Sequence, residues 1–390
     1  MLYGFPDFNK WSSPLLFLTL QGLIFTLLLF WRWRKNRNVS DLLLGFLLLF
    51  LCYHRTTYTI GFMAWYDTFP NTKINYFLIP FGLSTGPLLY LYVKSITTSN
   101  FKFKKIHLWH FLPQLIFTVY RLFILGYDSL QPGFDATQNG VLMENVNNQV
   151  IDVFYSTLSQ MQLLLYLAFT VQLFYHYRQK IQQYYSNTFQ LELNWVRNFL
   201  AIYILLFVYS LIEMLLGITV FDLHWTHRWW YHFIAALAII YIGIKGYFTD
   251  TGKLVDLEFN MVVPQVASLE PSKSNQDYQK DMQKVQSLFE NEKVYLDPDL
   301  SLKSLAEKLK ISPTHLSETI NNGFMKNFND FINGYRVEEV KSQLNQGRNK
   351  ELSLVGIAMD CGFNSKATFN RVFKKMTGYS PSEYVRSIED

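Results

Sequence analysis

Seven segments of this chain are long and apolar enough to cross a lipid bilayer as helices, and this feature restricts the fold more than any other. A helix needs about 20 mostly apolar residues to cross the hydrocarbon core. The segments are Pro14–Trp31, Asp41–Phe62, Ile74–Ile96, Ile106–Tyr127, Ile151–Tyr175, Val196–Gly217 and Trp229–Phe248. The sequence therefore predicts an all-α protein in which residues 1–253 form a seven-helix transmembrane domain.

Charged residues are distributed unevenly along the chain. They make up only 17% of its 390 residues, below the roughly 25% of an ordinary soluble protein. Residues 1–270 contain 18 Lys and Arg and 14 Asp and Glu, whereas the last 120 residues contain 17 and 16. The first part is poor in charge, and the second part is rich in charge and nearly neutral. This difference indicates a membrane domain followed by a soluble domain.

Basic residues between the apolar segments are concentrated in alternate loops. They lie near the first, third and fifth loops and after the last segment: Arg32, Arg34, Lys35, Arg37, Lys94, Lys102, Lys104, Lys105, Arg178, Lys180, Arg197, Lys245 and Lys253. Such loops remain on the cytoplasmic side of a membrane. The pattern therefore predicts a multi-pass protein of the inner (cytoplasmic) membrane, with the N-terminus outside and the C-terminal domain in the cytoplasm.

Five ionisable residues lie on the outer side of the apolar segments: His54, Arg55, Arg121, Asp152 and Glu213. Charged groups in a bilayer usually face the interior of a helix bundle or a water-filled cavity. One interpretation is an outward-open pocket for a small molecule or a peptide, and an anion suits the two arginines. The other is that Arg55 and Arg121 pair with Glu213 and Asp152 as ties between helices. The sequence leaves both interpretations open.

No motif in the apolar part indicates an enzyme. It lacks the G-x-S-x-G and H-E-x-x-H patterns and any phosphate-binding glycine loop. The two cysteines, Cys52 and Cys361, lie far apart in apolar helical contexts, which excludes a disulfide scaffold. We therefore predict no catalytic residue, no metal site and no cofactor.

The stretch from Ser353 to Tyr384 has the layout of a helix-turn-helix. Ser353 caps a short helix, and Gly362 ends it because glycine adopts the left-handed conformation without a Cβ penalty. Asn364 or Ser365 caps a second helix. The buried face of that helix is predicted to contain Ala367, Phe369, Val372, Phe373 and Met376, and its other face carries Lys366, Asn370, Arg371, Lys374 and Lys375. A helix with an apolar back and a basic front suits the major groove of DNA.

A first copy of this pattern precedes it at Leu300–Ile320. Ser301 and Leu305 correspond to Ser353 and Ile357, 52 residues later. Residues 327–344 between the copies predict a helix about 27 Å long, close to the 34 Å of one DNA turn. One chain could thus place both recognition helices on one face of double-stranded DNA without a palindromic dimer.

The remaining boundary lies between the membrane domain and this module. Residues 254–276 contain Pro264, Pro271 and several serines without an apolar period, which predicts a linker. Residues 277–390 are then the DNA-binding domain. Its first amphipathic segment, Asp277–Asn291, either begins this domain or transmits a signal from the last apolar segment.

The second copy closely resembles the second helix-turn-helix of the AraC family of bacterial transcription regulators. The match covers Gly362, Phe363, Ser365, Phe369, Arg371, Phe373, Lys374, Gly378, Ser380 and Pro381, and Phe331, Tyr335, Arg336 and Val337 match the helix between the copies. Apolar segments such as GPLLYLYVKSIT also resemble those ahead of AraC-type modules in membrane-anchored regulators.

The resemblance implies which residues contact DNA. They are Thr314, Ser317 and Glu318 in the first recognition helix and Lys366, Ala367, Asn370, Arg371, Lys374 and Lys375 in the second. Many relatives carry Arg where this chain has Glu318, so the first helix is expected to contribute little affinity.

These patterns together predict a membrane-bound one-component transcription regulator that couples an extracellular or membrane signal to sequence-specific DNA binding. The expected partners are double-stranded DNA and the lipid bilayer. Further candidates are a small-molecule or peptide ligand, a second copy of the chain in a homodimer, and RNA polymerase if the protein is an activator. One alternative is a transporter or membrane enzyme with a regulatory helix-turn-helix appendage, and another is a protein-docking module that binds no DNA.

Overall fold

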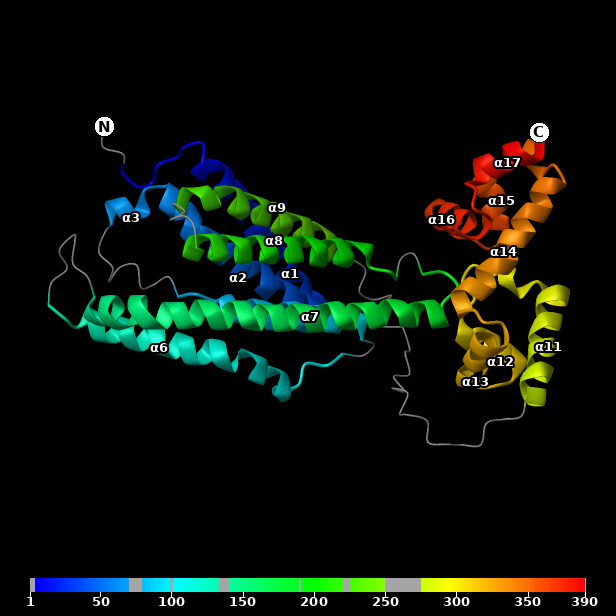
Figure 1. Cartoon of the computed structure of the whole chain (residues 1–390), viewed down its shortest axis with the longest axis horizontal. Helices are drawn as coiled ribbons and strands as arrows, with labels where there is room; N and C mark the ends of the chain where they lie inside the picture. Colours follow the sequence, from blue (N-terminus) through cyan, green and yellow to red (C-terminus); the bar gives the residue numbers. More distant parts are fainter. Residues whose placement is uncertain are drawn as a thin grey trace. The chain divides into compact units, whose positions relative to one another are not determined.

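The computed structural model describes residues 4–69, 79–98, 101–132, 140–188, 191–219, 225–249 and 275–389, and they are almost entirely helical (Figure 1). No strand occurs within these ranges, and Tyr185 and Ser301 form an isolated antiparallel bridge. The chain divides into two compact units. The first comprises Met1–Phe174 with Asn194–Phe259, and the second comprises Tyr175–Leu193 with Asn260–Asp390.

The first unit is built from the apolar segments. Its helices are α1 (Ser12–Asn36), α2 (Val39–Phe62), α3 (Trp65–Thr68), α5 (Gly82–Thr97), α6 (Leu112–Ser129), most of α7 (Asp152–Tyr184), α8 (Asn194–Thr219) and α9 (Trp229–Tyr247). A 3₁₀ turn, Lys105–Phe111, leads into α6, and a π-helical turn, Met143–Ile151, leads into α7.

Six of the helical stretches within the described ranges are long and apolar enough to cross a membrane: Ser12–Asn36, Val39–Phe62, Lys105–Ser129, Met143–Tyr184, Asn194–Glu213 and Trp229–Tyr247. The predicted third span, Ile74–Ile96, is represented by α5, which has 16 residues. Residues 74–78 lie outside the described ranges. An all-helical chain with several long apolar helices is thus confirmed, whereas the count of seven spans stays a prediction.

Helix α2 packs against α1, α5 and α9. Its leucines are buried on several sides, which explains why the segment is apolar all round rather than along one stripe. Glycines leave room for side chains of the neighbouring helices: a Cβ at Gly22 would lie 2.5 Å from Cys52 Sγ, and one at Gly243 would lie 2.8 Å from the Phe25 ring. Small residues at such crossings are typical of helices that pack in membranes.

The described residues of the second unit form the helices α11 (Asn275–Glu292), α12 (Leu302–Leu309), α13 (Pro313–Glu318), α14 (Phe328–Asn345), α15 (Leu354–Asp360), α16 (Lys366–Thr377) and α17 (Pro381–Glu389). It also includes the last turns of α7 and the segment after it. The predicted helix at Asp277–Asn291 is α11, and its Val285 and Phe289 are fully buried with α12 and α13. It therefore forms part of the same core as the first helix-turn-helix.

Helix α14 joins two hydrophobic cores. Its N-terminal half packs Phe328, Phe331 and Ile332 into the core of α11, α12 and α13. Its C-terminal half packs Val337, Val340 and Leu344 into the core of α15 and α16. One continuous helix thus belongs to both helix-turn-helix motifs.

Candidate functional site

The first helix-turn-helix is formed by α12 and α13. Ser301 Oγ accepts a hydrogen bond from Ser304 N at 3.2 Å, and Ser312 Oγ accepts one from His315 N at 3.2 Å, so each helix has a side-chain cap. Lys310 ends α12 in the left-handed conformation. The predicted contact residues Thr314 and Glu318 are exposed on α13, and Ser317 is half-buried.

The second helix-turn-helix is formed by α15 and α16. Ser353 Oγ caps α15 by accepting from Gly356 N, and Ser365 Oγ caps α16 by accepting from Thr368 N, both at 3.1 Å. Of the two predicted caps, Asn364 and Ser365, the serine is thus the one used. Gly362 has φ = +90°, as expected for a residue that turns the chain out of α15.

The two faces of α16 separate apolar from basic residues. The buried residues are Thr368, Phe369, Val372 and Phe373. Lys366, Ala367, Asn370, Arg371, Lys374 and Lys375 are all exposed. The structure therefore places all six predicted contact residues of α16 on its exposed surface. Ala367 was predicted on the buried face but is exposed. Thr368 is buried there instead, and its Oγ1 accepts a hydrogen bond from Ser365 Oγ at 2.8 Å.

The side chain of Arg336, on α14, is buried and donates hydrogen bonds to the loops around it. It is 1% exposed. Its Nε donates to Tyr295 O at 2.7 Å and its Nη2 to Asp297 O at 2.7 Å and to Ser186 Oγ at 3.2 Å. Burial lowers the pKa of the Arg336 guanidinium to about 10, so it remains charged at neutral pH. Its role is structural, because no exposed atom is left for DNA.

The segment that follows α7 is anchored on this unit. Ser186 donates to Leu300 O through its N, at 3.3 Å, and through its Oγ, at 2.6 Å. Asn329 of α14 donates through Nδ2 to Ser186 O at 2.7 Å and to Tyr185 O at 3.1 Å. These contacts hold the backbone of Tyr185 and Ser186 in place, just ahead of Thr188 and Glu192 in the chain.

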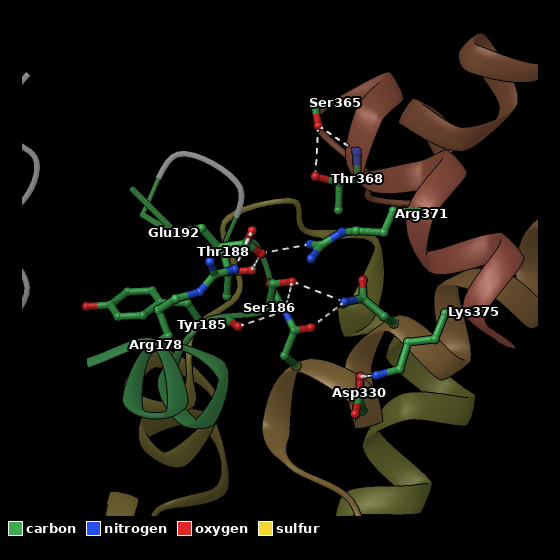
Figure 2. A network of polar contacts seen from close by, with 12 residues as sticks. Arg178, Tyr185, Ser186, Thr188, Glu192, Asp330, Ser365, Thr368, Arg371 and Lys375 are labelled. Atoms are coloured by element: carbon green, nitrogen blue, oxygen red, sulfur yellow. Dashed lines mark hydrogen bonds and ion pairs between the residues drawn. The ribbon is translucent and has the colours of Figure 1, made fainter. Parts of the chain in front are cut away.

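Glu192 contacts the predicted DNA-reading arginine (Figure 2). It is 3% exposed, and its Oε1 accepts from Arg371 Nη2 at 2.8 Å and from Thr188 Oγ1 at 2.8 Å. Its Oε2 accepts from Arg178 Nη2 at 3.2 Å. Lys375 forms a similar ion pair, at 2.7 Å, with Asp330 Oδ1 of α14. Two of the predicted DNA-contacting cations are therefore held by carboxylates of the same unit.

Sequence reasoning missed Glu192, although a signal existed. Residue 192 lies 179 positions from Arg371, so no local pattern relates the two. It is nevertheless the single acidic residue between His176 and Trp195, in a loop that otherwise carries basic residues. A lone carboxylate in a predicted cytoplasmic loop is a candidate partner for a basic recognition helix.

The five ionisable residues of the apolar segments are distributed over separate contacts. Arg121 lies 3.8 Å from Asp152, and Glu213 pairs with Arg228 at 2.7 Å. Arg55 contacts His232 of α9, and the His54 ring centroid lies 6.3 Å from that of His232. Of the five, Arg55 alone lines a cavity between α2, α7, α8 and α9.

The comparisons with known proteins concern the C-terminal unit. Residues 305–387 match a family model described as a helix-turn-helix domain. YijO of Escherichia coli K12, an uncharacterized HTH-type transcriptional regulator, is 35% identical over 105 residues, which cover 26% of this chain and 36% of that protein. SACOL0084 of Staphylococcus aureus COL, with the same description, is 32% identical over 111 residues, 28% of this chain and 14% of that protein.

The chain therefore spans about a third or less of the length of these curated relatives. No solved structure matches the chain.

Proposed function

Since the C-terminal residues of this chain form an AraC-type helix-turn-helix domain of transcriptional regulators, we propose that the protein is a membrane-bound one-component regulator. Its first unit receives a signal from the membrane or from outside the cell. Its second unit binds promoter DNA in a sequence-specific way, and the signal changes the affinity of that binding.

The membrane location is supported by the surface of the first unit. Large apolar side chains are exposed along α6, α7 and α8, among them Leu115, Phe123, Phe154, Leu165 and Leu205, each at least half exposed. Such surfaces are costly in water and ordinary in lipid. The alternation of basic loops supports an orientation with the DNA-binding unit in the cytoplasm.

DNA reading is assigned mainly to α16. Arg371 has the fork of donors that matches the O6 and N7 atoms of guanine, and Asn370 can pair with adenine. Lys366, Lys374 and Lys375 are placed to contact phosphates on either side. On α13, Thr314, Ser317 and Glu318 add contacts, with Glu318 accepting from cytosine.

The observation that carries the coupling is the ion pair between Glu192 and Arg371. Through Oε1, the Glu192 carboxylate accepts a hydrogen bond from Arg371 Nη2, one of the donors that a guanine edge or a phosphate would use. Arg371 cannot donate this hydrogen to both, so Glu192 competes with DNA. The segment that carries Glu192 joins α7 to α8, two helices proposed to cross the membrane. A signal that shifts α7 against α8 can therefore withdraw Glu192 and release Arg371.

Replacement of Glu192 by Gln tests this coupling. We expect the full-length Glu192→Gln protein, in detergent or lipid nanodiscs, to bind its DNA site about three- to tenfold more tightly than the unmodified protein. The reason is that a partly exposed ion pair of order 1 kcal/mol no longer opposes binding. The DNA site comes from sequencing DNA crosslinked to the protein in cells, and affinity is measured by fluorescence anisotropy.

Two further variants make the outcome decisive. Glu351→Gln removes the same charge from an exposed position and should leave affinity unchanged. In an Arg371→Ala background, which should itself weaken DNA binding by about 1–3 kcal/mol and relax specificity at the base pair that Arg371 reads, Glu192→Gln should add no affinity. Equal affinities of Glu192→Gln and unmodified protein would refute the competition.

A further inference from the structure

A cavity of about 70 Å³ lies among α2, α7, α8 and α9 of the first unit. Its walls are mostly apolar, from residues such as Leu51, Leu163, Phe207 and Ile239. Its polar side chains are few: Arg55, Gln160, Tyr203, Ser210 and Tyr231. An apolar cavity with a small number of converging polar groups is the usual form of a small-molecule site.

Arg55 is the single cationic residue among those that line the cavity, and its charge is not neutralised there. It is 5% exposed. Its Nη1 donates to His232 Nδ1, a neutral acceptor, and its guanidinium carbon lies 5.1 Å from the centre of the Tyr231 ring. Its Nε has no hydrogen-bond partner, and no Asp or Glu of the described ranges forms an ion pair with it. A buried charge without a counter-charge is strongly unfavourable.

Gln160 of α7 adds a second unsatisfied group. Its Oε1 is buried and has no hydrogen-bond partner. A flip of the Gln160 carboxamide, which exchanges the positions of its oxygen and nitrogen, would present its NH₂ group to an anion in the cavity. The cavity thus provides donors from α2 and from α7 for a group that accepts hydrogen bonds and carries negative charge.

We propose that this cavity binds a short-chain carboxylate of two or three carbons. The negative charge supplies the counter-charge that Arg55 lacks, and the planar carboxylate matches the guanidinium fork. The alkyl end would lie against the apolar wall. The volume limits the length of the ligand. About 70 Å³ is roughly half of the 150 Å³ that holds the six carbons of benzene, so the ligand must have fewer non-hydrogen atoms than benzene.

The role of this carboxylate as the signal rests on the proposed function, whereas its binding does not. The cavity is lined by α7 and by α8, and the segment that carries Glu192 joins these two helices. A ligand that changes how α7 packs on α8 within the first unit would therefore alter the path of that segment.

Binding is tested on the full-length protein in phosphatidylcholine nanodiscs with acetate, propionate, hexanoate, acetamide and chloride as probes. We expect the thermal midpoint to rise with the logarithm of acetate or propionate concentration. Hexanoate is too long and acetamide lacks the charge, so neither should raise it. Arg55→Gln should abolish the shift, and Arg228→Gln, which removes a half-exposed arginine from the same unit, should keep it.

Three results would overturn the carboxylate site. They are no shift with either short carboxylate, the same shift with acetamide, and a shift with chloride equal to that with propionate. The probe comparison needs no variant, so it stands even if Arg55→Gln fails to fold. Nanodiscs that contain phosphatidylserine separate the sources: a higher midpoint there without added propionate, lost in Arg55→Gln, would show that a lipid headgroup reaches Arg55 and would overturn the limit to short carboxylates.

The signalling role has its own readout. Propionate should change DNA affinity in the unmodified protein and leave it unchanged in Glu192→Gln. Binding of propionate without any change in DNA affinity would leave the carboxylate site standing and refute its place in the proposed function.

Discussion

Among the described glycines of the second unit, Gly362 has the least space for a side chain. With φ = +90°, it occupies a conformation that side chains disfavour. A Cβ there would lie 2.5 Å from Tyr295 O and 2.9 Å from Arg336 Nε. The residue therefore serves two purposes at once: it ends α15, and it lets the turn contact the segment that Arg336 anchors.

Gly362→Ala is expected to destabilise the second unit by about 3 kcal/mol or more, because backbone strain and a clash with a backbone carbonyl combine. Hydrogen exchange of the α15 and α16 amides in the full-length protein measures this loss. The matched control is Gly378→Ala, where φ is +83° but nothing lies within 4 Å of the new Cβ. That variant should lose only about 1 kcal/mol, the strain alone, and equal losses in both would argue against the clash.

At the scale of elements, α11 is tied to α13 by a hydrogen bond between two side chains. Asp281 Oδ2 lies 2.7 Å from His315 Nε2 of α13, and Asp281 Oδ1 accepts from Lys284 Nζ at 2.9 Å. The hydrogen bonds from His315 and then from Lys284 hold the pKa of the Asp281 carboxyl below its usual 3.8. The folded state therefore binds fewer protons at Asp281 than the unfolded state does.

This difference predicts an acid-sensitive attachment of α13. The contribution of Asp281 to the free energy of unfolding is fully present above about pH 5. It is lost as the pH falls below 3.8 and passes through the pKa that the carboxyl has in the folded state. Asp281→Asn should reduce the protection of α13 amides at neutral pH by about 1–2 kcal/mol and make it less dependent on pH in this window. Asp360→Asn, in an exposed pair 3.5 Å long, is the control and should change neither property.

Most elements could be predicted because their signals are local. The apolar runs, the caps Ser353 and Ser365 and the left-handed Gly362 each depend on a few neighbouring residues. Thr368 was not predicted as buried because threonine is polar and its burial depends on the Ser365 hydroxyl. The Glu192–Arg371 pair depends on how distant segments pack, which side-chain periodicity does not encode.

For the whole molecule, the predicted orientation makes a direct experiment possible. Cys52 and Cys361 are both buried, so an added exposed cysteine can be labelled above a low background. Asn36→Cys lies beside the basic residues after α1, and Ser129→Cys lies at the end of α6. A membrane-impermeant maleimide should label Ser129→Cys in intact cells and Asn36→Cys only after permeabilisation, because basic loops stay inside. Labelling in the opposite pattern would invert the topology and place the DNA-binding unit outside.

The continuous α14 has a consequence for the promoters that this protein can use. It holds together two unlike helices that are proposed to read DNA, α13 with an exposed Glu318 and α16 with its lysines and Arg371. The two helices differ in sequence and no symmetry relates them, so the DNA site need not be palindromic. A bound chain therefore has one defined orientation along the double helix. Inverting the DNA site would reverse the orientation of the protein relative to the gene.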